Sequence, residues 1–140
     1  TLMPVHLEHI TQPTQQDWID LGKIYTDAPQ EWLTDTRDIQ ASLQELLDQG
    51  EWLIAGRFNA RLLGALKAEK DGNTINLRHL CVRNVTINRG VAHQMLHHMN
   101  KWADENGYIL VAKDVPDELS APLISRGFTQ DSANFIRNPK

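Results

Sequence analysis

The sequence predicts an α/β (α+β) fold with a mixed, mainly antiparallel sheet flanked by helices. Strand-like segments, in which apolar residues alternate or cluster, are separated by longer stretches with apolar residues at helical spacing. Two of the strand-like segments are joined by a tight turn and continue into a third, which is typical of an antiparallel meander. A helix between two later strands predicts one parallel β-α-β unit with a right-handed crossover.

Composition indicates one globular domain. The chain has 140 residues, 41% hydrophobic and 23% charged, so residues 1–140 are expected to share one core. A formal net charge of −4 argues against nucleic-acid binding, because such domains usually carry a basic face. Cys81 is the only cysteine, no apolar run reaches the ~20 residues that span a bilayer, and no signal-peptide pattern opens the chain. These features predict a cytoplasmic protein.

The N-terminal segment predicts a strand followed by a helix. Residues 5–10 alternate apolar and polar side chains, which predicts a strand with one buried face. Thr14 and Asp17 have the spacing of a capping box, so a helix is expected to begin there. Pro29 disfavours helix in the residue before it, and the helix is expected to end near residues 27–29.

A second helix and the meander follow. Asp35 or Thr36 can cap the helix, and Gly50 is a natural C-terminal stop. Asn59-Ala60 and the segment around Gly72 read as the two turns of the meander. Its strands are expected at residues 51–59, 61–68 and 74–82.

The rest of the chain alternates helix and strand. An amphipathic helix is expected to begin after Gly90 and to end at Gly107. The later elements are expected at residues 108–112 (a buried strand), 117–125 (a short helix that Asp117 caps) and 128–136 (a last strand or hairpin).

The candidate site is the stretch from Leu80 to Leu96, which passes from a strand through a polar loop into a helix. A helix start has N–H groups without intrahelical partners and a weakly positive dipole end. Gly90 lets a large anion approach the backbone, and Arg89 adds a cation that can grip phosphate. The pattern predicts a pyrophosphate cradle. An ordinary strand-to-helix connection remains the alternative, because glycine-rich phosphate motifs have many false positives.

Residues 87–92, Ile-Asn-Arg-Gly-Val-Ala, resemble the signature (Gln/Arg)-x-x-Gly-x-(Gly/Ala) of the GNAT acyltransferase family. Ile87 departs from the usual Gln or Arg, whereas Gly90 and Ala92 match. The Gly127-Phe128 pair and the order of the elements are also similar to that family. The resemblance implies a GNAT-like fold and binding of coenzyme A or acetyl-coenzyme A.

Two longer strings are similar to the PanZ (PanM) family of GNAT-like regulators. They are R-F-N-x-R-L-L at residues 57–63 and V-x-x-V-T-x-x-R-G-V at residues 82–91. The resemblance implies a protein partner, the aspartate decarboxylase precursor, which cleaves its own backbone to form a pyruvoyl group when the loaded factor docks. It also implies regulation of pantothenate and coenzyme A synthesis. The chain departs from the family at residues 31–50.

The resemblance implies cofactor contacts along the strand, the loop and the first helical turn. The expected residues are Leu80, Cys81, Val82, Thr86, Ile87, Asn88, Arg89, Gly90, Val91, Ala92 and His93. The first three would offer backbone groups to the pantetheine arm, and the alternative is that they pair only within the sheet. Cys81 is expected to be a quiet thiol. His93 and His97 have metal-ligand spacing, but a solvated helix face is the preferred interpretation and no metal is expected.

Arg57 and Asn59 are the expected partner-binding residues, with a solvated turn as the alternative. Leu123 stands four residues before Gly127, where many GNAT enzymes carry a tyrosine acid. Leucine cannot donate a proton, so no catalytic residue is assigned and a ligand-responsive regulator is favoured. A genuine N-acetyltransferase that transfers an acetyl group from acetyl-coenzyme A to an amine is the alternative, and a scaffold without ligand binding is the third hypothesis.

Overall fold

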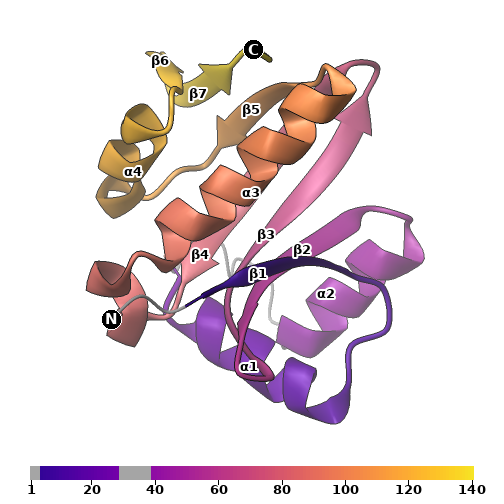
Figure 1. Cartoon of the computed structure of the whole chain (residues 1–140). Helices are drawn as coiled ribbons and strands as arrows, with labels where there is room; N and C mark the ends of the chain where they lie inside the picture. Colours follow the sequence, from indigo (N-terminus) through magenta and orange to yellow (C-terminus); the bar gives the residue numbers. More distant parts are fainter. Residues whose placement is uncertain (1–3, 29–38) are drawn as a thin grey trace.

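A single seven-stranded sheet of order β1-β2-β3-β4-β5-β7-β6 organises the part of the chain that the structure describes (Figure 1). The computed structural model describes residues 4–28 and 39–140, and for residues 87–89 it describes the backbone only. The expected caps Asp35 and Thr36 lie outside the described residues. The strands are β1 (His6–Ile10), β2 (Trp52–Phe58), β3 (Arg61–Asp71), β4 (Thr74–Val82), β5 (Ile109–Lys113), β6 (Thr129–Asp131) and β7 (Asn134–Arg137).

The described helices lie on both faces of this sheet. The α-helices are α1 (Gln15–Thr26), α2 (Ile39–Asp48), α3 (Val91–Asn106) and α4 (Ser120–Ser125), and the 3-10 helices are η2 (Asn84–Arg89) and η3 (Asp117–Leu119). Figure 1 shows α3 running across one face, beside α4, with α1 and α2 on the other. The core divides accordingly into one apolar cluster under α3 and α4 and another under α1 and α2.

The predicted sheet type is confirmed. Neighbouring strands are antiparallel throughout, except that β4 and β5 are parallel and α3 connects them. The meander turn at Asn59-Ala60 is also confirmed, since both residues have positive φ values of 49° and 68°. The last segment is a hairpin of β6 and β7.

Helix α1 begins as its sequence predicts. The Thr14 side chain accepts a hydrogen bond from the Asp17 N–H, and the Asp17 carboxylate accepts one from the Thr14 N–H, so the capping box is complete. The helix ends with Asp27 as its C-cap, as expected.

Two local predictions were wrong, and a third was met only in part. Pro116 takes the N-cap position of η3, so Asp117 begins that helix and caps nothing with its side chain. The polar loop before Gly90 is the 3-10 helix η2. The expected buried face of β1 is incomplete because Leu7 is only partly buried where it borders a hollow beside α3.

Close packing of α3 on the sheet depends on a glycine in β3. A Cβ atom on Gly64 would lie 2.7 Å from the Met95 sulfur and 2.9 Å from Cγ1 of Val82. Real Cβ atoms do not approach other atoms so closely, so the absence of a side chain lets Met95 rest on the strand. This contact fixes the first turns of α3, and with them Gly90, against β3 and β4.

Candidate functional site

Strand β4 changes its pairing at His79. Its parallel ladder with β5 ends at the pair Arg78–Lys113, whereas its ladder with β3 continues to Cys81 and Val82. The register with β3 shifts between Ala65 and Lys67, and His79 has a positive φ of 54°, which marks a bulge. From His79 to Val82, β4 therefore has a neighbour on one side only among the strands that the structure describes.

The three strand residues expected to contact coenzyme A lie at this open edge of β4. Leu80, Cys81 and Val82 bury their side chains, so what they can offer at the open edge is backbone N–H and C=O groups. The cleft beside this edge holds about 10 Å³ and is lined by Asp27, Cys81, Val82, Asn84, Pro116, Glu118 and Leu119. Asp27 also accepts a 2.9 Å hydrogen bond from the Asn84 N–H, which ties the end of α1 to the start of η2.

Gly90 joins η2 to α3 in a left-handed conformation with φ 77°, and, its chain neighbours and the helix backbone aside, no atom of the described residues lies within 4 Å of a Cβ placed there. The first N–H groups of α3 have no intrahelical acceptor. The side chains of Val91 and Ala92 are buried, and His93 is partly exposed. The described side chains therefore leave space above Gly90, as an anion cradle requires. Thr86 is buried, and its hydroxyl donates to the Arg83 carbonyl at 2.7 Å, so it shapes η2. The side chains of Ile87, Asn88 and Arg89 lie outside the description.

Cys81 has the surroundings of an unreactive thiol. Burial, and then the charges of Asp27 and Glu118, raise the pKa of Cys81 to about 12. Its Sγ–H points to the Ile24 carbonyl at 3.3 Å. A thiol that stays protonated at neutral pH is a poor nucleophile.

A pair of ionisable groups at the bulge was missed by the sequence reasoning. Lys67 Nζ donates to Nδ1 of His79 at 2.8 Å, which leaves the ring proton on Nε2, 4.0 Å from the Asp114 carboxylate. Burial, with the charge of Arg78, lowers the pKa of Lys67 to about 8. Burial, with the charges of Lys67 and Arg78, lowers the pKa of His79 to about 4. The one available signal was a histidine beside an arginine in a strand whose other residues are mostly apolar.

Arg57 is held within the chain. Its guanidinium donates to Glu8, to both oxygens of Asp17 at 3.1 and 3.3 Å, and to the Ala60 carbonyl at 3.0 Å. It therefore joins β2 to β1, to α1 and to its own turn. The solvated-turn alternative does not describe Arg57, whereas Asn59 is exposed at the turn.

The position of the usual GNAT acid carries no proton donor. Leu123 is fully buried in the core under α4. Glu69 is exposed near the end of β3, and the Tyr108 ring packs against Trp102 with Lys70 over it. Among the described residues, no three histidine, cysteine or carboxylate side chains gather as a metal site would need.

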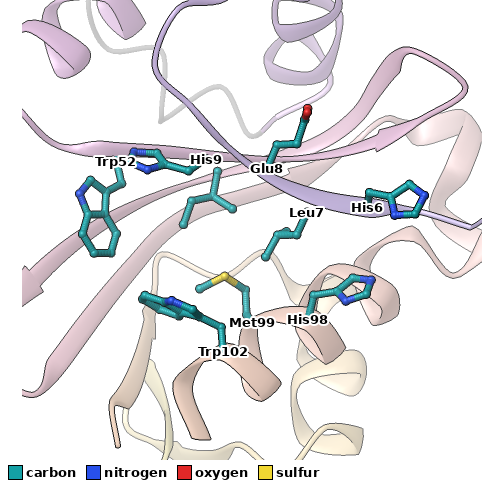
Figure 2. Close-up of a pocket in the computed structure, with 9 residues that line it drawn as sticks. His6, Leu7, Glu8, His9, Trp52, His98, Met99 and Trp102 are labelled. Carbon is teal, nitrogen blue, oxygen red and sulfur yellow. The ribbon is translucent and has the colours of Figure 1, made fainter. Parts of the chain in front are cut away.

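An apolar hollow of about 560 Å³ lies between β1, β2 and α3. Figure 2 shows Leu7 and Met99 facing each other across it, Trp52 and Trp102 at one end, and Glu8 turned away. The hollow borders the middle of α3 and not its open start, so we place the candidate site at Gly90.

The sequence profile of the PanZ acetyltransferase (GNAT) domain matches residues 4–134. The chain belongs to the PanZ family. The PanD regulatory factor of Salmonella typhimurium is 34% identical over 92 residues, which cover 66% of this chain and 61% of that protein. The match thus spans about three-fifths of the curated relative. None of the described helices is long and apolar enough to cross a membrane.

Solved structures show the same fold. YhhK of E. coli, described as an N-acetyltransferase and solved in solution bound to coenzyme A, has a TM-score of 0.70 at 26% identity. That match covers 97% of this PanZ-family chain and 99% of YhhK. The acetyltransferase yncA of Salmonella typhimurium, solved with acetyl-CoA, has a TM-score of 0.69 at 14% identity. That match covers 97% of this chain and 94% of yncA. The predicted GNAT-like fold is confirmed.

Proposed function

We propose that this chain is a coenzyme A-binding regulator that promotes self-cleavage of the aspartate decarboxylase precursor, and so regulates pantothenate and coenzyme A synthesis. Membership of the PanZ family and similarity to a PanD regulatory factor support the regulatory role. The CoA-bound structure of YhhK supports the ligand. The observation that carries the proposal is the open β4 edge leading directly to a left-handed Gly90 at the start of α3.

We infer that coenzyme A or acetyl-coenzyme A would lie along the open β4 edge and the start of α3. Backbone groups of Leu80, Cys81 and Val82 would pair with the amides of the pantetheine arm, and the N–H groups after Gly90 would receive the pyrophosphate. Bound acetyl-coenzyme A would supply a thioester at this edge. The cleft holds about 10 Å³, little more than one water, so the pantetheine arm requires η3 to move away from β4.

The proposed partner surface includes the turn after β2. Asn59 and Ala60 are both exposed at this turn, and Asn59, which carries the polar side chain, would make the contact. Arg57 would act mainly by holding the turn through the Ala60 carbonyl. Asn59→Gly removes the side chain and keeps a left-handed backbone accessible, so this variant isolates the contact from the stability of the turn.

Acetyl transfer to an amine is the second candidate function. His79 is the residue that could act as its base. Its ring lies beside the open edge, but a pKa of about 4 makes it a weak base, and Lys67 occupies Nδ1. With Leu123 in the core, no proton donor stands at the usual position. We expect turnover to be very weak or absent in a thiol-release assay with polyamines, amino acids and peptides. Vigorous turnover on any of these substrates would make acetyl transfer the preferred function.

Calorimetry with Gly90 variants tests the ligand. Coenzyme A is expected to bind the parent protein 1:1. Gly90→Asn accepts the left-handed backbone, whereas Gly90→Glu adds a carboxylate that repels the pyrophosphate. We expect the glutamate variant to bind at least about tenfold more weakly than the asparagine variant. Absence of heat with either coenzyme A or acetyl-coenzyme A would favour a scaffold without ligand binding.

A further inference from the structure

A basic hollow of about 610 Å³ lies between α3, α4 and the C-terminal strand. Its charged lining residues are Lys101, Asp104, Glu105, Arg126, Arg137 and Lys140. Cations outnumber carboxylates there, although the whole chain has a formal net charge of −4. A local excess of one sign in a concave surface concentrates counter-ions of the other sign.

Three buried polar atoms of the residues that line this hollow lack hydrogen-bond partners in the described part of the chain. Arg137 is 5% exposed, and its terminal nitrogens donate to the Asp104 carboxylate at 2.9 and 3.0 Å, but its Nε–H finds no acceptor among the described residues. Asn100 is 8% exposed and donates to the Arg126 carbonyl, but its Oδ1 accepts from no described residue. Nε of Arg126 is also unpartnered, and within the described residues the remaining such atom is Nε of Arg83. Buried polar groups normally have partners, so this grouping needs an explanation.

The unpartnered atoms define the chemistry of an occupant. The two Nε–H groups of Arg126 and Arg137 require an acceptor, and a negatively charged oxygen suits guanidinium donors best. Oδ1 of Asn100 requires a donor. We propose that this hollow binds a small oxyanion that also carries a hydrogen-bond donor, such as a phosphate monoester or a hydroxycarboxylate. The three atoms are covered from solvent, and Arg126, which is only partly buried, is the side chain that would turn to admit the ligand.

This hollow is separate from the cradle at Gly90. The α3 residues that line it run from His97 to Glu105, beyond the first turn of the helix. At a rise of ~1.5 Å per residue, Asp104 lies roughly 20 Å along the helix from Gly90. A ligand here would be additional to the coenzyme A that we propose at Gly90.

Nitrogen-15 NMR of the arginine Nε–H groups tests the proposal directly. Inorganic phosphate is titrated into the labelled protein at pH 6.5, with sodium chloride keeping the ionic strength constant. We expect the Nε–H signals of Arg126 and Arg137 to shift and to saturate. Glycolate should bind about fivefold more tightly than acetate, because its hydroxyl can donate to Asn100. This comparison uses the parent protein and does not depend on the folding of a variant.

Variants locate the site. Arg126→Gln should weaken phosphate binding about tenfold, whereas Lys23→Gln on α1 removes one charge from the opposite face and should change nothing. Gly90→Asn should also leave the phosphate response unchanged, which separates this site from the coenzyme A cradle. If phosphate shifts the signals no more than chloride does, only water occupies the hollow and the proposal is overturned. An Arg126→Gln variant that responds like the parent would overturn it as well.

Discussion

Replacing Arg57 by alanine should destabilise the fold before it affects any partner. The substitution removes the donors that Asp17 and Glu8 share and leaves the Asp17 carboxylate buried without its cation. Losing one partner of a buried ion pair costs ~3–5 kcal/mol. The Arg57 and Glu8 side chains are 25% and 43% exposed and that of Asp17 is 6%, so we expect a loss of about 2 kcal/mol. With ~2.1 cal/mol/K of unfolding entropy per residue, this lowers the Tm of a 140-residue chain by about 7 °C.

The pH dependence identifies the cause of this loss. Burial alone would raise the pKa of Asp17, but hydrogen bonds from Arg57 and Thr14 outweigh it and hold the pKa below its ordinary value of 3.8. A carboxyl with a lowered folded-state pKa stabilises the fold above its unfolded-state pKa, and this contribution is lost as pH falls through the folded-state value. The difference between parent and Arg57→Ala should therefore be largest near pH 7 and should shrink below pH ~4.

Chemical denaturation from pH 3 to 7 measures both effects. Asp17→Asn is the matched background, because its amide oxygen can still accept from the Thr14 N–H while the charge is gone. In that background Arg57→Ala should cost less than half as much. An Arg57→Ala protein with the parent's Tm at every pH would refute the reasoning, and Arg57 would then be free to act in docking alone.

Three further predictions concern packing and titration. Gly64→Ala should lower the free energy of unfolding by ~1–3 kcal/mol, because the new Cβ would meet Met95 and Val82. Gly22→Ala has open space and should be neutral or stabilising. Thermal unfolding of both variants would show whether α3 packs as described. His79 should make stability rise with pH between about 4 and 6.5, because its lowered folded-state pKa lets the unfolded chain bind more protons there; denaturation curves of His79→Gln should lack this rise. Cys81 should react with a thiol reagent at pH 8 ~10³-fold more slowly in the native protein than after unfolding, and equal rates would contradict its assigned pKa.

Features encoded in adjacent residues were predictable from the sequence. The capping box needs Thr14 and Asp17 at a fixed spacing, and the turn at Asn59-Ala60 begins with an asparagine, which tolerates positive φ. Both could therefore be recognised from a few adjacent residues. The glycine before α3 was equally local. These elements determine where the meander, the parallel unit and the cradle at Gly90 lie.

Features that depend on residues far apart in the chain were not predictable. Arg57 meets Asp17 across 40 positions, and whether it is paired or free depends on how α1 packs beside β2. The bulge at His79 follows from a register shift between β3 and β4, which no single-strand pattern encodes. The basic hollow likewise brings Asn100, Arg126 and Arg137 together from α3, the end of α4 and β7.

Self-cleavage of the aspartate decarboxylase precursor is the most direct measure of the proposed function. Purified precursor is mixed with this protein, with and without acetyl-coenzyme A, and the two cleaved chains are followed by mass spectrometry. We expect acceleration only when protein and ligand are both present, and we expect Gly90→Glu to abolish it while Gly90→Asn retains at least part of it. No acceleration by the parent protein at any ligand concentration, or equal acceleration by Gly90→Glu, would contradict the account.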